Sequence, residues 1–319
     1  MIRSRRFRFK YRDLLLFWTK WHWGNLVCQS PLFGFPQFWD IIAREMSKVP
    51  KISVIVPCHN YGRYLGQCLT SIFNQTLPPD EVIVVDDASE DNTPEVVKNF
   101  SKKFPNLKYY RVDFHNGNKT RNFGFKKSSG NYLVFFDADN YMRKEFLEKL
   151  YEVLEGDPAA AFAYCDRYNV PEGDVSWYPP PVGLWRSKDF DPHLLKLNNY
   201  IDLASLVRRS AFPGFDEKLK RLQDWDFWLN LVLLKGGRGL YLPEPLFFYR
   251  VHKRGITARE DLAVAKSYIR QKYGRELFPY NQPYYWRLKD VFLKIGYITG
   301  TDALLRRVKR FLFDRNRRG

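Results

Sequence analysis

Two acidic motifs carry side chains able to bind a metal ion or to move a proton. Asp137 and Asp139 follow the apolar run Tyr132–Phe136, and Asp224 lies at the start of the predicted helix Gln223–Leu234. Mg²⁺ and Mn²⁺ bind one or two carboxylates together with phosphate oxygens. We therefore expect Asp137 and Asp139 to hold Mn²⁺ or Mg²⁺ beside a diphosphate. A carboxylate is also a suitable general base, and we expect Asp224 to act as one.

Both motifs also have a purely structural interpretation. Aspartate is common in solvated turns after strands, and acidic side chains in the first turn of a helix interact favourably with the helix dipole. Trp225 and Trp228 favour the catalytic interpretation of Asp224. Two tryptophans would form an apolar cleft wall that raises the proton affinity of a carboxylate and stacks on a sugar ring.

Polar side chains also follow two earlier strands. Asp86 and Asp87 come directly after the apolar run Glu81–Val85. A carboxylate there can accept hydrogen bonds from a base N–H or a ribose hydroxyl, or it can simply cap the next helix. The residues that we expect to frame a base after the first strand are Pro57, His59, Asn60 and Tyr61.

A basic segment near residue 250 could contact the same ligand. The imidazole of His252 can bind a metal ion, and Arg250, Lys253 and Arg254 can hold diphosphate oxygens. A basic surface turn is the structural alternative.

Strands and helices alternate along the middle of the chain. Continuous apolar runs predict buried strands, and apolar residues at helical spacing follow them. The predicted strands are Ile52–Val56, Glu81–Val85, Leu107–Val112 and Tyr132–Phe136. A helix carrying Leu65, Leu69 and Ile72 follows the first strand, and Thr93 and Pro94 mark the N-cap and first position of the next helix. This alternation predicts the α/β class, with a Rossmann-like, mostly parallel sheet flanked by helices and ligands at the carboxyl ends of the strands.

Charge and composition divide the chain into three parts. Residues 1–50 are basic and aromatic, residues 51–255 form the predicted α/β domain, and residues 256–319 form a predicted helical extension with a basic end. The formal net charge of +17 favours anionic partners. Both ends suit an anionic membrane surface, or they pack on the domain or on a second subunit.

One apolar run and the cysteine spacing indicate where in the cell the chain lies. The apolar run Leu14–Trp18 is too short to span a bilayer, and the four cysteines show no metal or disulfide spacing. We expect a cytoplasmic chain that lies peripherally at the inner face of the cell membrane.

Six short motifs in this order resemble the family 2 glycosyltransferases of the GT-A fold. They are Ser53–Pro57, Val85–Ser89, Arg121–Gly124, Asp137–Asp139, Asp224–Asp226 and Tyr249–His252. The resemblance covers about residues 51–255 and implies inverting transfer from a nucleoside-diphosphate sugar. Ala88 stands where this family usually has glycine, and Gln223 stands where it usually has glutamate.

The resemblance also implies roles for individual residues. Asp224 looks like the base, Asp137 and Asp139 look like the ribose and metal contacts, and His252 looks like a further metal ligand. The expected nucleotide-sugar contacts are Pro57, His59, Asn60, Tyr61, Asp86, Asp87, Lys119, Arg121, Asp137, Ala138, Trp225 and Arg250. We expect a glycan or lipid-linked acceptor, as in the synthesis of cell-surface polysaccharide or glycolipid, and no nucleic acid.

Two other functions would use some of the same features. A non-enzymatic basic adaptor for membranes or nucleic acids would explain the charge, but it leaves the clustered aspartates unexplained. A sugar nucleotidyltransferase also has a Rossmann-like sheet and a metal ion. It would need a glycine-rich basic loop after the first strand, where this chain has Pro57-Cys58-His59-Asn60-Tyr61.

Overall fold

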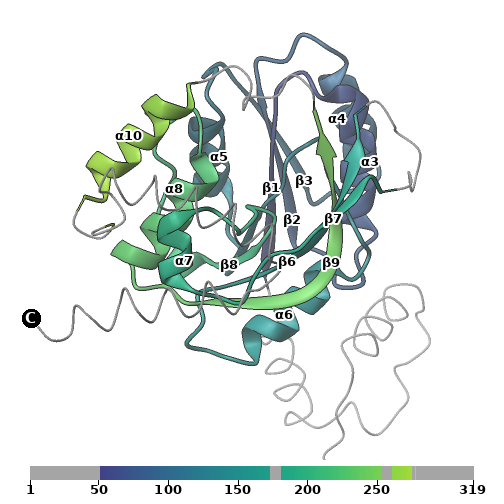
Figure 1. Ribbon diagram of the computed structural model, residues 1–319. Coiled ribbons are helices and arrows are strands. Elements are labelled where there is room, and N and C mark those ends of the chain that lie inside the picture. The colour runs from purple at the N-terminus through teal and green to yellow at the C-terminus, as the bar shows by residue number, and fades with distance from the viewer. Residues whose placement is uncertain (1–50, 173–180, 253–260, 275–276, 278–319) are drawn as a thin grey trace, which may run out of the picture. The chain divides into compact units, whose positions relative to one another are not determined.

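The computed structural model describes residues 51–172, 181–252, 261–274 and 277 (Figure 1). The strands are β1 Ile52–Cys58, β2 Glu81–Asp87, β3 Leu107–Val112, β4 Tyr132–Phe135, β5 Tyr141–Met142, β6 Phe162–Pro171, β7 Gly183–Trp185, β8 Leu206–Arg208 and β9 Gly239–Val251. The helices are α3 Gly62–Phe73, α4 Thr93–Ser101, α5 Gly117–Lys127, α6 Phe146–Glu155, α7 Pro192–Leu197, α8 Gln223–Leu229 and α10 Leu262–Lys272, with short helical turns η2 Arg209–Ala211 and η3 Asn230–Leu234. The basic aromatic N-terminal segment and the basic C-terminal end lie outside the described residues.

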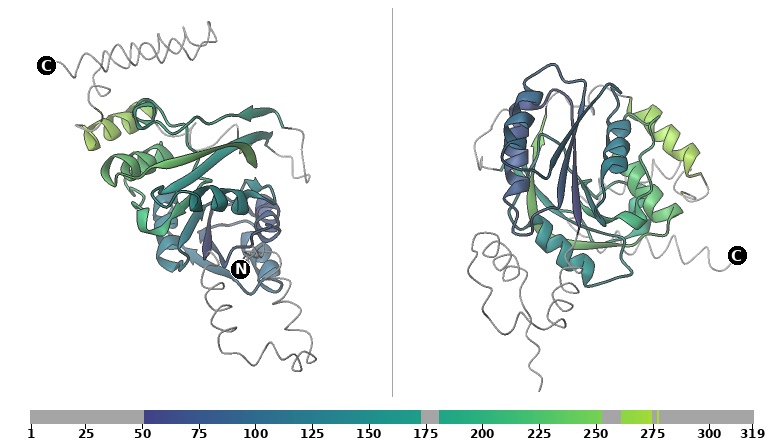
Figure 2. Two further views of the ribbon diagram at one scale, coloured as in Figure 1. Left: turned by 90° about the horizontal axis from the view of Figure 1, so that it is seen from below. Right: turned by 180° about the vertical axis from the view of Figure 1, so that it is seen from behind.

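The first half of the sheet is parallel, as the alternation of strands and helices predicts. Strands β3, β2, β1 and β4 lie side by side in that order. Every residue of β2 and β4 is buried, because helices cover this part of the sheet on both faces. Helices α3 and α4 lie on one side and α5 lies on the other (Figures 1 and 2). The predicted α/β class is confirmed.

The second half of the sheet is mixed. The short strand β8 pairs antiparallel with both β4 and β6, and β6 then pairs parallel with β9. Strands β5 and β7 add antiparallel pairs at β9 and β6. The sheet therefore joins a parallel half, which carries the ends of β1, β2 and β4, to a mixed half that carries the end of β9.

Several predicted element boundaries need correction: β2 continues through Asp87, and β4 ends at Phe135. Strand β1 continues through Pro57, which lies opposite Val85 in the ladder. The N-cap of α4 is Asn92 rather than Thr93, because Thr93 is already helical and donates its hydroxyl to Asp91 at 2.5 Å. Helix α8 ends at Leu229 and continues as the wider turn η3.

Helix α5 approaches the sheet closely at a glycine. A Cβ atom at Gly124 would lie 2.4 Å from Cγ2 of Ile55, so a larger residue would push the helix away from β1. This contact fixes α5, and with it the side chains in its first two turns, against the strand ends.

No helix within the described residues is long and apolar enough to cross a bilayer.

Candidate active site

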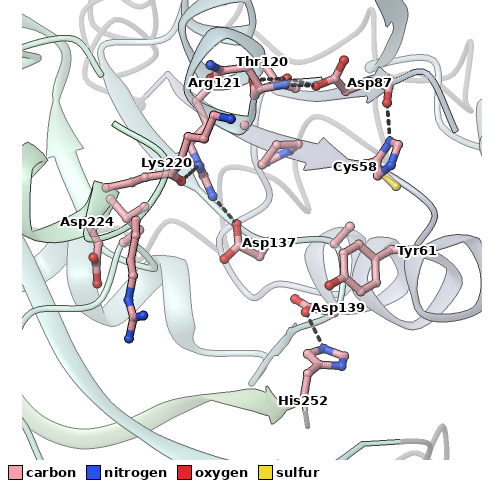
Figure 3. A pocket seen from close by; sticks show the side chains of 18 of the residues that line it. Cys58, Tyr61, Asp87, Thr120, Arg121, Asp137, Asp139, Lys220, Asp224 and His252 are labelled. Atoms are coloured by element: carbon pink, nitrogen blue, oxygen red, sulfur yellow. Dashed lines mark hydrogen bonds and ion pairs between the residues drawn. The ribbon is translucent and has the colours of Figure 1, made fainter. Parts of the chain in front are cut away.

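A cleft of about 770 Å³ opens where the ends of β1, β2, β4 and β9 meet the start of α8 (Figure 3). Its lining consists of Pro57, Cys58, His59, Tyr61, Asp87, His115, Asn116, Gly117, Thr120, Arg121, Asp137, Ala138, Asp139, Arg167, Asp202, Leu203, Lys220, Arg221, Leu222, Gln223, Asp224, Tyr249 and His252. Ten of the residues expected from the sequence are in this lining: Pro57, His59, Tyr61, Asp87, Arg121, Asp137, Ala138, Asp139, Asp224 and His252. The strand ends thus bring together residues that lie up to 195 positions apart (57 to 252).

Asp87 anchors the loop at one end of the cleft. Its carboxylate accepts hydrogen bonds from the backbone N–H groups of Phe114, His115 and Asn116 at 2.6, 2.9 and 2.8 Å. The hydroxyl of Thr120 donates a fourth bond at 2.9 Å. Burial acts to raise the pKa of Asp87, but these hydrogen bonds outweigh it and the pKa is lowered. Asp87 therefore stays ionised and holds the backbone that lines this end.

The adjacent Asp86 has a different role from the one that its position in the motif suggests. Its side chain is fully buried and accepts hydrogen bonds from Tyr109 at 2.6 Å and from Arg111 at 3.3 Å. It is absent from the cleft lining. The expected nucleotide contact is corrected: Asp86 joins β2 to β3, because neighbouring residues of a strand point to opposite faces.

Two of the remaining expected contacts near the strand ends also lie outside the lining. Asn60 has a left-handed backbone, with φ at 58°. Its side-chain oxygen accepts from Glu90 at 2.8 Å, so it joins the loops after β1 and β2. Lys119 is exposed on the first turn of α5 and is not among the lining residues.

Ala88, directly after β2, has an unusual backbone conformation. Its φ is 56°, in the left-handed region that favours glycine. The residue that differs from the family pattern is therefore in a conformation that costs an alanine about 1–2 kcal/mol.

Arg121 joins three elements at the centre of the cleft. One guanidinium nitrogen donates to Asp137 at 2.9 Å, and the other donates to Gln223 at 3.0 Å. Gln223 is the first residue of α8. Arg121 thus fixes the carboxylate that follows β4 relative to the helix that carries Asp224.

Asp139 and His252 face each other on the opposite wall (Figure 3). Oδ2 of Asp139 lies 2.7 Å from Nε2 of His252, and Nδ1 of the same ring lies 3.2 Å from Glu172. The hydrogen bond to Asp139 raises the pKa of His252, and burial raises the pKa of Asp139. A carboxylate oxygen and an imidazole nitrogen, both of them possible metal ligands, are therefore adjacent beside the cleft.

Asp139 and His252 fit a divalent cation whose remaining ligands come from a bound substrate. Among the residues that the structure describes, no group of three or more His, Cys, Asp or Glu side chains is arranged to hold a metal ion. Mg²⁺ in nucleotide sites takes one or two carboxylates and receives its other ligands from phosphate oxygens and water. Asp139 would provide such a carboxylate and His252 an imidazole nitrogen, and a bound cation would offset the burial of the Asp139 carboxylate.

Asp224 lies at the other side of the cleft. Its carboxylate accepts hydrogen bonds from Asn199 at 2.7 Å and from the N–H of Trp225 at 2.8 Å. Burial raises the pKa of Asp224, and the negative charge of Asp202 raises it further. The preceding Leu222 has φ at 61°, a strained conformation for leucine that turns the chain sharply into α8.

The two tryptophans of α8 do not form a cleft wall. Trp225 and Trp228 are buried, and their indole N–H groups donate to the carbonyl oxygens of Leu195 and Ile201 at 2.7 and 2.9 Å. The expected sugar contact by Trp225 is corrected: both rings belong to the core that holds α8 in place.

Arg250 is also structural. Its side chain is fully buried, donates to the carbonyl of Asp139 at 3.0 Å and to Gln67 at 2.8 Å, and lies over the ring of Tyr64. It supports the Asp139 backbone instead of contacting diphosphate. Tyr249, its neighbour on β9, lines the cleft, since successive side chains of a strand point to opposite faces.

The cleft lining also includes a polar pair that no sequence motif indicated. Arg167 bonds to Asp202 and is enclosed by the rings of Trp185 and Tyr249, whose centroids lie 4.6 and 3.9 Å from its guanidinium carbon. Arg167 and Asp202 lie in the mixed half of the sheet and its loops, where the sequence carries no short motif.

Comparison with known protein families identifies the same region. The family model described as "Glycosyl transferase family 2" matches residues 53–214, just over half of the chain. Glycosyltransferase GlyA of Streptococcus pneumoniae is 36% identical over 219 residues, which are 65% of this chain and 31% of GlyA. The matched region thus spans less than a third of that relative.

Two solved structures share the fold. TarS residues 1–349 from S. aureus, in complex with UDP-GlcNAc, align with a TM-score of 0.56 at 22% identity, over 69% of this chain and 65% of that one. The mannosyltransferase PcManGT from Pyrobaculum calidifontis, in complex with GDP-Man and Mn²⁺, aligns with a TM-score of 0.55 at 20% identity, over 88% of both chains.

Proposed function

The chain belongs to glycosyltransferase family 2, and from this premise we propose that it moves a sugar from a nucleoside-diphosphate sugar to an acceptor hydroxyl in the cleft described above. The observation that carries the proposal is the convergence of Asp87, Arg121, Asp137, Asp139, His252 and Asp224 on one cleft. Structural neighbours that bind UDP-GlcNAc and GDP-Man support a nucleotide-sugar donor.

The donor would lie along the strand ends. Its nucleoside would occupy the end between Pro57, His59 and the loop that Asp87 holds, where backbone groups and a rigid turn provide the walls. Its diphosphate would then lie near Arg121 and Asp137. The fixed guanidinium of Arg121 provides a positive charge near the carboxylate that would contact the ribose.

Asp139 and His252 would hold Mn²⁺ or Mg²⁺. When bound, the cation would neutralise negative charge on the departing nucleoside diphosphate. The manganese-bound neighbour supports this assignment.

Asp224 would act as the general base of a single displacement. The acceptor oxygen would form its bond to the anomeric carbon as the bond from that carbon to the diphosphate breaks, and the acceptor proton would pass to Asp224. Attack from the face opposite the leaving group inverts the configuration of that carbon. The raised pKa of Asp224 suits this role, because a carboxylate of higher pKa accepts a proton more readily.

We further propose a glycan or lipid-linked acceptor and a site of action at an anionic membrane surface. The basic aromatic residues 1–50 and the basic C-terminal end support the membrane part of the proposal. Membership of a glycosyltransferase family argues against both the non-enzymatic adaptor and the sugar nucleotidyltransferase.

A donor screen tests the proposal. The full chain is incubated with UDP-, GDP- and dTDP-sugars, with Mn²⁺ or with EDTA, and the released nucleoside diphosphate is measured. We expect slow release from at least one donor, with water as the acceptor, and loss of release in EDTA. A folded chain that neither cleaves any donor nor shows a thermal shift with any nucleoside diphosphate would contradict the proposal.

A further inference from the structure

Helix α10 packs on the helix that carries Asp224. It runs beside α8 in two of the views (Figures 1 and 2). Its apolar residues, and two that follow it, belong to the same buried cluster as the core of α8, and this shared cluster includes Ala265, Ile269, Tyr273, Leu277, Phe227 and Trp228. The described part of the C-terminal region is therefore part of the fold around the cleft.

A lysine of α10 binds two carboxylates that lie before and after a chain segment lining the cleft. Nζ of Lys272 lies 2.8 and 3.0 Å from the two carboxylate oxygens of Asp226 and 2.7 Å from Asp216. Tyr273 donates to Asp226 at 2.8 Å, and Tyr268 donates to Asp216 at 2.9 Å. Two side chains of α10 and that of its C-cap residue Tyr273 thus converge on two aspartates.

Lys272 compensates the negative charge of the buried Asp226 carboxylate. Asp226 is buried, and burial raises its pKa, while the hydrogen bond and charge of Lys272 oppose that rise. Removing the cation from a buried pair leaves an uncompensated charge, which is strongly destabilising. The ammonium of Lys272 thus allows a carboxylate to lie beneath the first turn of α8.

The two aspartates bracket the segment that enters the cleft. Lys220, Leu222 and Asp224 all line the cleft and lie between Asp216 and Asp226. Leu222 has the strained left-handed backbone noted above. A strained turn persists only where its surroundings hold both ends, and Lys272 binds both ends.

We propose that Lys272 is a positioning residue of the transfer reaction. By binding Asp216 and Asp226 together, it fixes residues 217–222 and the first turn of α8, and so aims the Asp224 carboxylate into the cleft. Helix α10 is then part of the catalytic unit rather than an appendage. This inference rests on the proposed function of Asp224.

The test compares Lys272→Met with Lys272→Arg and with Lys235→Met, an exposed lysine after η3 that serves as the matched control. The measurements are turnover of the donor found in the screen, affinity for its nucleoside diphosphate, and amide hydrogen exchange of residues 217–224. For Lys272→Met we expect at least a tenfold loss of kcat, less than a threefold change in nucleotide affinity, and at least tenfold faster exchange. Lys272→Arg should restore most of the turnover, and the control should match the wild type.

A second variant covers the case in which Lys272→Met does not fold. The double variant Lys272→Met/Asp226→Asn removes the buried charge with its partner and still lacks the bridge to Asp216, so it should fold and show the same loss of kcat. Unchanged kcat in the folded variants, or a loss confined to nucleotide affinity, would overturn the inference. A wild-type chain without any turnover would instead overturn the proposed function, and the inference with it.

Discussion

Substitution of Asp87 by asparagine tests how the nucleoside end of the cleft is built. An amide keeps one oxygen, which can still accept from Phe114 and His115 as Oδ1 does. The amide nitrogen that replaces Oδ2 faces the N–H of Asn116 and the hydroxyl of Thr120, at 2.8 and 2.9 Å. Both hydrogen bonds to the charged oxygen are lost: the N–H of Asn116 then faces another donor, and the hydroxyl of Thr120 can at most turn towards the carbonyl of Asn116 and accept a weaker, neutral bond from the amide.

The size of the effect follows from those two bonds. Each hydrogen bond to a charged acceptor contributes about 1.5–3 kcal/mol net, so the loss lies between about 3 and 6 kcal/mol. The loop is at the surface, and water can replace part of what is lost, so we expect a value near 3 kcal/mol. Domains of this kind are stable by about 5–15 kcal/mol, and the variant should therefore fold.

Urea denaturation and hydrogen exchange measure this prediction. Exchange of the amides of residues 114–116 should accelerate in Asp87→Asn, and the thermal shift with nucleoside diphosphate should shrink. Asp113→Asn is the control, because Asp113 is in the same loop and its side chain is 79% exposed; its unfolding free energy should stay at the wild-type value.

The pH dependence gives an independent check on Asp87. The folded pKa of Asp87 is lowered, so its stabilisation is present above the unfolded carboxyl pKa and is lost as the pH falls through the folded pKa. The difference between Asp87→Asn and the wild type should therefore shrink in acid. An unfolding free energy within about 1 kcal/mol of the wild type at pH 7, with unchanged exchange at residues 114–116, would refute the reasoning.

Three further predictions concern stability and pH. Glu81→Gln should lower the unfolding free energy by about 2 kcal/mol in urea denaturation. Burial opposes ionisation of Glu81, but hydrogen bonds from Lys108, Ser53 and Ser129 lower its pKa to about 2, so this loss of stability should vanish as the pH falls from about 4.5 towards 2. The exposed control Glu152→Gln should show no loss of stability. Ala88→Gly should raise the melting temperature, because glycine relieves a left-handed strain of about 1 kcal/mol; a lower melting temperature would contradict the assignment. The acid limb of the kcat–pH profile should lie above the usual carboxylate range, because burial raises the pKa of Asp224, whereas a limb at or below that range would exclude Asp224 as the titrating base.

The parallel half of the fold could be predicted because its signals are local. Continuous apolar runs gave β1 to β4, and β3 was predicted with its observed bounds, Leu107–Val112. The mixed half depends on pairing between distant segments, such as Phe162 with Gly239, and on strands of only three residues. Local patterns carry no signal for such pairing.

Residue type and motif order located the cleft but did not decide which way each side chain points. Asp86 and Arg250 were expected to contact the ligand, yet both are buried and fully engaged within the fold. Their neighbours Asp87 and Tyr249 line the cleft instead. Whether a side chain at a strand end reaches the cleft depends on which distant segments pack around it, and that is a property of the assembled sheet.

The central claim is that Asp224 takes the acceptor proton in a cleft that binds the nucleotide sugar through other residues. The most direct measurement compares Asp224→Asn with the wild type for both turnover of the cleaved donor and affinity for its nucleoside diphosphate. We expect turnover to fall by roughly 10²–10⁴-fold, the range for removal of a general base, with affinity within threefold, because Asp224 lies across the cleft from Asp87 and the loop that it holds. Turnover close to that of the wild type, with the nucleotide still bound, would contradict the account.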